Sequence, residues 1–281
     1  GSLLIFTSNK FTATDLATMP FEQAEQIRIA EAQTVQTPYL WLAGVVLFVA
    51  FLFWITKMPE PVQPSTSGKR GWEGIFKNRH LVLGIVAQFC YVGAQACLWG
   101  YFIDLKIEQA PEQHFAPVEF MKPFFEWLTG DGEALTAKRW AAFHLSFGFI
   151  LFMVGRFAGT WMMSFIRPQR LLTVFAAATF LLFVFGVNAS GLTGVVAILF
   201  ANFFMSIMFP TIFALGTKNL GEQVKIGSSL IIMAIVGGAL LPPALGAIAD
   251  SVSYQKAFWL PALCFLMIMF YGWKGHKIKE I

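Results

Sequence analysis

Long stretches without a charged side chain are the feature of this sequence that most restricts what it can fold into. Residues 171–217, for example, contain no Asp, Glu, Lys or Arg over 47 positions. A helix needs about 20 apolar residues to cross the hydrocarbon core of a bilayer. Because lipid offers no partners to an irregular backbone, such stretches are expected to be membrane-spanning helices. The sequence therefore predicts an all-α membrane protein.

Seven spans of this kind are expected. The 171–217 stretch is long enough for two crossings joined at residues 188–191, and the other five lie at 39–56, 81–103, 140–166, 226–249 and 257–273. Hydrophobic residues make up 57% of the chain and charged residues 13%. Soluble proteins have about 45–50% and about 25%. The composition thus agrees with a chain that faces lipid.

The charges between the spans predict an orientation. Basic residues gather after the first, third, fifth and seventh spans, whereas the connections on the opposite side are acidic. Cytoplasmic loops carry an excess of Lys and Arg. We therefore expect a multi-pass protein of the bacterial inner membrane with a cytoplasmic C-terminus. The net charge of +4 then reflects this topology, and a nucleic-acid partner is not expected.

The chain divides into three parts. Residues 1–57 are expected to hold an outer loop and one span, with a short amphipathic helix at 21–32 and Pro38 opening the span. Residues 58–79, rich in Pro, Ser and Gly, are typical of a cytoplasmic linker. Residues 80–281 then form a six-helix block that is typical of one half of a symmetric transporter. The chain begins without Met, and we expect an N-terminal half of the same transporter to precede it.

Polar side chains within spans are costly in lipid and usually face a cavity or another helix. In the 81–103 span, four polar or aromatic residues recur on one helix face, namely Gln88, Tyr91, Gln95 and Trp99. Amides can bond sugar hydroxyls, and an aromatic ring can stack on a sugar's apolar face. The alternative is hydrogen bonding of the two glutamines between helices. We favour the sugar-binding interpretation.

A second stripe contains Asn202 and Phe209. Asn202 either faces the same cavity or serves as a helix-packing amide, and the pattern does not separate the two. Two further features are interpreted as gating and packing elements. They are the segment with Gly155, Arg156 and Gly159, and the glycine and proline pairs Gly237, Gly238, Pro242 and Pro243.

Several kinds of chemistry lack a sequence signal. The three cysteines and His144 show no metal-ligand spacing, and His144 is interpreted as a structural hydrogen-bonding residue. No motif for an enzyme or a cofactor occurs. No Asp or Glu lies in the middle of a span, although a proton-coupled carrier needs a buried carboxylate. Any coupling acids are therefore expected in the preceding N-terminal half.

Several ordered segments resemble a known family of membrane transporters. They are Ala87-Gln-Phe-Cys-Tyr-Val-Gly-Ala-Gln95, Gly155-Arg-Phe-Ala-Gly-Thr-Trp161, Phe204-Met-Ser-Ile-Met-Phe-Pro-Thr-Ile-Phe213 and Lys218-Asn-Leu-Gly221, followed by Gly227-Ser-Ser229 and Ala234-Ile-Val-Gly-Gly238. Together they resemble the fucose–galactose–glucose:proton symporter family of the major facilitator superfamily, and most closely its L-fucose branch. The resemblance covers roughly residues 38–264.

The resemblance implies twelve helices in two halves, of which this chain supplies the sixth to the twelfth. It also implies alternating access around one sugar site. Gln88, Tyr91, Gln95 and Asn202 match positions where the family's C-terminal half lines the cavity. Phe209 departs from the fucose branch, which has a tyrosine there, and is similar to the glucose/galactose branch. Gln95 is similar to the fucose branch.

Three hypotheses about function follow. The first is sugar:proton symport, with L-fucose as the leading substrate and glucose, galactose or N-acetylglucosamine as alternatives. The second is a facilitative carrier or a non-sugar permease on the same fold, without proton coupling. The third, a membrane-embedded enzyme, is disfavoured because no catalytic cluster is seen.

Overall fold

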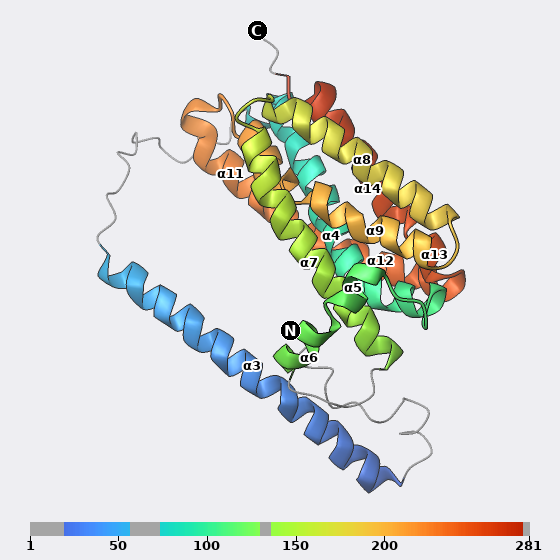
Figure 1. Ribbon diagram of the computed structural model, residues 1–281. Helices are drawn as coiled ribbons and strands as arrows, with labels where there is room; N and C mark the ends of the chain where they lie inside the picture. The colour runs from blue at the N-terminus through green and yellow to red at the C-terminus, as the bar shows by residue number, and fades with distance from the viewer. Residues whose placement is uncertain (1–19, 57–73, 130–135, 278–281) are drawn as a thin grey trace.

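The computed structural model describes residues 20–56, 74–129 and 136–277, and every regular element within them is helical. Figure 1 shows a bundle of long helices with one further helix, α3, standing beside it. The long helices of the bundle are α4 (Arg79–Gln109), α7 (Ala137–Met162), α8 (Pro168–Asn188), α9 (Leu192–Met205), α10 (Met208–Gly216), α11 (Val224–Met233), α12 (Gly237–Ser251) and α14 (Trp259–Phe270). The all-α prediction is confirmed for the described residues.

Helix α3 runs without interruption from Phe21 to Ile55 and includes Pro38. The prediction of a separate short helix at 21–32 was therefore wrong, whereas the apolar part of the helix does begin directly after Pro38, at Tyr39. A proline removes one amide donor but permits helical φ, so the helix continues through it. The apolar part of α3, Tyr39–Ile55, is shorter than a full span. Its side chains are exposed throughout, which suits lipid or another protein surface.

Helix α4 is the centre of the bundle. It packs against α12, α14, α10 and α7, while α8 packs against α9 and α14. Small residues allow the backbones to approach closely. A Cβ atom at Gly237 would lie 2.2 Å from the Phe89 carbonyl oxygen, and one at Gly93 would lie 2.9 Å from the Gly237 carbonyl oxygen. The contact between α4 and α12 therefore depends on these glycines.

The predicted number of spans is matched only in part. Among the described residues, five helical segments are long and apolar enough to cross a membrane. A sixth crossing arises if α9 and α10 count as one span, although they are bent by 41°. The sequence contains a cause for this bend, since Pro210 lacks the amide that would bond the carbonyl of Ser206. The seventh prediction corresponds to the shorter apolar part of α3.

The segment 224–251 passes from α11 through the short 3₁₀ helix η3 (Ala234–Val236) into α12. The change in helix geometry therefore lies just before Gly237 and Gly238. Pro242 and Pro243 lie inside α12, where they remove two amide donors. The helical path nevertheless continues to Ser251.

Short helices occur in the connections that follow α4 and α12. They are α5 (Ala116–Phe120), α6 (Lys122–Thr129) and α13 (Tyr254–Ala257). Helices α5 and α6 lie in the acidic connection between α4 and α7.

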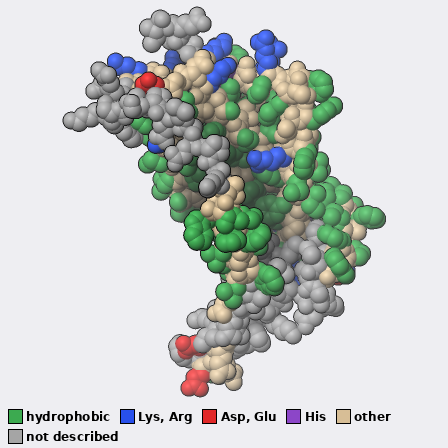
Figure 2. Space-filling view, turned by 90° about the vertical axis from the view of Figure 1, so that its left-hand side faces the viewer, with side chains coloured by type: hydrophobic (Ala, Val, Ile, Leu, Met, Phe, Trp, Pro, Cys, Tyr) green, Lys and Arg blue, Asp and Glu red, His purple; other side chains and the backbone are tan. Residues whose placement is uncertain are grey.

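The surface of the described residues is largely apolar between two charged ends. Figure 2 shows a mostly hydrophobic face, with Lys and Arg side chains gathered at one end of the bundle. Basic residues stand at the corresponding helix ends and connections, including Arg79, Arg167, Arg170, Lys218, Lys225 and Lys274. An apolar band below a basic rim is the arrangement expected of a bundle that crosses a membrane.

Candidate substrate site

The polar stripe on α4 lies against α9 and α10. Gln88 and Tyr91 are buried, whereas Gln95 and Trp99 are partly exposed. The stripe therefore passes from the interior of the bundle towards a more accessible surface. Asn202 is buried and Phe209 is partly exposed on the facing helices. The structure thus brings together residues that are more than a hundred positions apart.

Tyr91 connects α4 to the bend between α9 and α10. Its hydroxyl donates a hydrogen bond to the Met205 carbonyl oxygen at 3.1 Å. Its ring meets that of Phe209 edge to face, with centroids 6.2 Å apart. The Gln95 amide also approaches the Tyr91 hydroxyl. Tyr91, Gln95 and Phe209 therefore form one continuous group of an amide and two rings.

Trp99 and Asn202 form a second group, nearer the C-terminal end of α4. The Trp99 indole N–H donates to Asn202 Oδ1 at 3.0 Å, and Asn202 Nδ2 donates to the Leu199 carbonyl oxygen at 2.9 Å. The indole also meets Phe149 and Phe152 of α7 edge to face. Residues from two other helices, α9 and α7, therefore fix the position of Trp99.

Gln88 differs from the rest of the stripe. Its side chain is fully buried, and neither of its amide atoms has a hydrogen-bond partner among the described residues. The Tyr271 hydroxyl is likewise buried without a partner in the described part of the chain, and it lies near Gly84, one turn before Gln88. Helical side chains point towards the N-terminal turn. Because it is fully buried, the Gln88 amide lies within the bundle in this structure.

Gly155 and Gly159 lie where α7 crosses the bend between α9 and α10. A Cβ atom at Gly155 would lie 2.2 Å from the Phe203 carbonyl oxygen, and one at Gly159 would lie 2.5 Å from Ile207 Cγ2. Arg156, between them, is exposed. It borders a shallow apolar pocket on α7 with Met153, Phe157, Thr160, Trp161 and Ser164.

The segment 218–221, quoted above for its resemblance, forms a tight turn after α10. Asn219 and Gly221 both have positive φ angles, of 57° and 53°. Asn and Gly are the residues that adopt this conformation most easily. His80, at the start of α4, hydrogen-bonds the Lys218 carbonyl oxygen at 2.9 Å. The turn is therefore held against the end of α4.

A cluster around His114, Trp140 and His144 lies where α4 ends and α7 begins. Of these residues, the sequence had singled out only His144. His144 Nδ1 lies 2.7 Å from the Trp140 carbonyl oxygen, and His144 Nε2 accepts from the Phe115 amide at 3.1 Å. These two contacts require the neutral tautomer with its proton on Nδ1. His114 stacks on Trp140 at 3.9 Å between centroids.

Further side chains tie this end together. Glu108 accepts from the Tyr254 and Gln255 amides at the start of α13, at 2.8 and 3.4 Å. Lys106 is buried and donates to the Ala110 carbonyl oxygen after the end of α4. A lysine in the last turn of a helix is a recognisable signal for such a contact.

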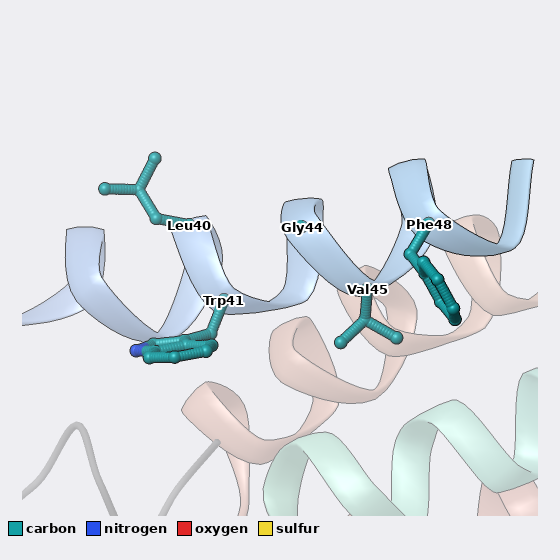
Figure 3. Close-up of a pocket in the computed structure, with 5 residues that line it drawn as sticks. All are labelled: Leu40, Trp41, Gly44, Val45 and Phe48. Atoms are coloured by element: carbon teal, nitrogen blue, oxygen red, sulfur yellow. The ribbon is translucent and has the colours of Figure 1, made fainter. Parts of the chain in front are cut away.

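A groove on α3 is of a different kind. It is bordered by Leu40, Trp41, Gly44, Val45 and Phe48, all on one helix (Figure 3). The side chains around it are apolar and exposed. Nothing there supplies the several convergent polar groups that a small-molecule site needs.

Relatives in sequence and in structure, rather than a family model, place the chain in a family. No family model matches it. It is 34% identical to the L-fucose-proton symporter of Escherichia coli, over 97% of this chain and 59% of that protein. It is also 34% identical to the glucose/galactose transporter of Brucella abortus, over 88% of this chain and 55% of that protein. The chain thus spans less than two thirds of the length of these relatives.

A solved structure agrees with the sequence relatives. The crystal structure of the Escherichia coli fucose:proton symporter superimposes with a TM-score of 0.72 and 33% identity, over 96% of this chain and 62% of that one. A second solved structure, of a major facilitator superfamily transporter in the outward conformation, superimposes with the same TM-score of 0.72. The chain therefore belongs to the major facilitator superfamily. Within it, the chain is a member of the fucose–galactose–glucose symporter family and corresponds to the C-terminal portion of its relatives.

Proposed function

We propose that this chain is the C-terminal portion of a secondary transporter that carries a monosaccharide with a proton by alternating access. The observation that carries this proposal is the match over nearly the whole chain to a fucose:proton symporter, in both sequence and structure. Its partners are the sugar, the proton, the bilayer and the N-terminal half of the same transporter. Residues 1–57 complete that half, 58–79 link the halves, and 80–281 form the second half.

The group of amides and rings on α4 and α10 supports a sugar as the substrate. Gln95, Trp99 and Phe209 combine partial exposure with the donors and ring surfaces that a sugar needs. Gln88 and Tyr91 are buried here, and they would contact sugar only in another state of the transport cycle. L-fucose is the leading substrate, and glucose, galactose and N-acetylglucosamine are the alternatives.

The gating elements fit the same proposal. Gly155 and Gly159 hold α7 against the bend between α9 and α10. Arg156 would meet carbonyls or an acid of the other half at the cytoplasmic face. The segment 224–251, which contains Gly237, Gly238, Pro242 and Pro243, would be a helix that moves during transport, and its change to 3₁₀ geometry just before Gly237 supports this role. The membrane is then the bacterial inner membrane, with the basic end of the bundle in the cytoplasm.

Uptake into proteoliposomes tests the proposal. The complete carrier, consisting of this chain and the portion its relatives have in addition, should accumulate labelled L-fucose when an inward proton gradient is imposed. Gln95→Ala should lower the uptake about tenfold or more, whereas Gln109→Ala on the same helix should not. Competition by unlabelled glucose, galactose and N-acetylglucosamine ranks the substrates. Failure to accumulate any hexose would refute the proposal.

A facilitative carrier is the second candidate. The described residues place Asp104 and Asp250 near helix ends and no Asp or Glu in the middle of a span. Concentrative uptake that is abolished by a protonophore supports symport. Uptake that only equilibrates, with or without the gradient, supports the facilitative alternative.

A further inference from the structure

Asn202 has both polar atoms of its side chain engaged within the protein. Oδ1 accepts from the Trp99 indole at 3.0 Å, and Nδ2 donates to the Leu199 carbonyl oxygen at 2.9 Å. The side chain is fully buried. A Cβ atom at Gly148 would lie 3.1 Å from Asn202 Nδ2, so α7 closes over the amide from the other side. Asn202 therefore lies between α4 and α7, away from any open surface.

Resting on the proposed sugar transport, we propose that Asn202 is a positioning residue that fixes the Trp99 indole as a sugar-stacking surface without contacting the sugar. Trp99 is partly exposed, and its partners come from two other helices. The Phe149 and Phe152 rings meet it at centroid distances of 5.1 and 5.6 Å, at angles of 79° and 75°. Asn202 supplies the polar contact that ring packing lacks.

The engaged N–H determines how Trp99 can recognise a sugar. An indole has one polar donor, and here that donor bonds Asn202. Contact with substrate is therefore left to the ring carbons, whose negative face attracts the C–H groups of a sugar. Trp99 should thus stack on an apolar face of the pyranose without bonding any of its hydroxyls. Fixing the ring before binding also lowers the entropy cost of association.

NMR of the indole N–H groups tests the positioning without any sugar. The complete carrier is labelled with ¹⁵N-tryptophan, and the Trp99 signal is identified as the one lost in Trp99→Phe. We expect Asn202→Leu to move this signal upfield, because the hydrogen bond is lost. Asn202→Ser, whose hydroxyl is too short to reach, should do the same and serves if the leucine variant does not fold. Thr179→Val, a buried and internally bonded site on α8, is the matched control. An unmoved Trp99 signal in the Asn202 variants would overturn the proposal.

A double-mutant cycle on sugar affinity tests the functional part. Asn202→Leu should raise the Kd for labelled L-fucose about three- to tenfold, as expected for one hydrogen bond. Trp99→Phe should have at least this effect. If Asn202 acts only through Trp99, adding Asn202→Leu to Trp99→Phe changes the Kd no further. Additive effects would show that Asn202 acts independently of Trp99 and would refute the proposal. Absence of hexose binding by the wild type would instead refute the proposed function, and the NMR comparison would still decide the positioning.

Discussion

The hydroxyl of Tyr91 donates a hydrogen bond to the carbonyl oxygen of Met205 at 3.1 Å, across the contact between α4 and α9. Met205 is the last residue of α9, directly before the 41° bend to α10. The buried Tyr91 hydroxyl thus bonds the backbone at the point where one span changes direction. The bond ties the bend to the helix that carries the proposed sugar stripe.

Tyr91→Phe tests the contribution of this bond. The phenylalanine keeps the ring contact with Phe209 and loses only the hydroxyl. We expect the free energy of unfolding to fall by about 1 kcal/mol, since a buried hydrogen bond contributes about that much. Thermal unfolding of the purified protein in detergent measures the change. Unchanged stability together with lost sugar binding would show that the hydroxyl serves the substrate instead.

Gly155→Ala tests the close approach of α7 to the bend. The added Cβ would lie 2.2 Å from the Phe203 backbone oxygen, so one of the two helices has to shift. Overpacking of this kind costs about 1–3 kcal/mol. We expect a clear drop in the temperature of unfolding.

Gly100→Ala on α4 is the matched control for this substitution. Nothing lies within 4 Å of a Cβ atom at Gly100. Alanine there should be neutral or stabilise the helix by up to about 1 kcal/mol. Equal stability of the Gly155→Ala and Gly100→Ala variants would show that α7 is not held by close packing at the bend.

Much of the fold follows from the charge-free stretches, because lipid permits few structures for an uncharged segment of 20 residues. The limits of the spans were less predictable. The continuous α3 was missed because Pro38 was given the role of a helix start, although one proline does not have to end a helix. The bend at 206–207 had a signal in Pro210, which a count of apolar residues ignores.

Only part of the candidate site could be predicted from the sequence. Periodicity places Gln88, Tyr91, Gln95 and Trp99 on one helix face, but it does not say which of them has a partner. The bond between Trp99 and Asn202 joins residues 103 positions apart and depends on how two helices pack. The choice for Asn202 between cavity and packing therefore depends on contacts that no local pattern contains.

Glu108 at the C-terminal end of α4 provides a third prediction. Its carboxylate accepts from two amides at the start of α13, as a capping side chain does. Glu108→Ala should destabilise the protein by about 1 kcal/mol, and Glu108→Gln, which keeps an acceptor, should cost less. Glu112→Ala, at an exposed position in the same connection, is the control. Equal unfolding temperatures for all three variants would contradict a capping role.

The pH dependence of the cluster around His114, Trp140 and His144 provides the last prediction. His114 lies in the connection after α4 and stacks on Trp140, and its buried Nδ1 has no hydrogen-bond partner among the described residues. Burial lowers the pKa of His114 below 6.5, the Lys106 charge lowers it further, and Glu119 opposes the shift. The fold thus favours the neutral ring. The associated stability is complete above pH 6.5 and is lost as the pH falls through the lowered pKa.

Acidification should therefore loosen the connection around His114. The reporter is the Phe115 amide, which is bonded to His144 Nε2. After correction for the intrinsic rate, its hydrogen exchange should accelerate between about pH 7.5 and about pH 5. His114→Phe keeps an aromatic ring against Trp140 but does not titrate, so the acceleration should shrink in this variant. Any part that remains reports on protonation of His144 itself. An identical acceleration in the wild type and in His114→Phe would exclude His114 as the titrating group.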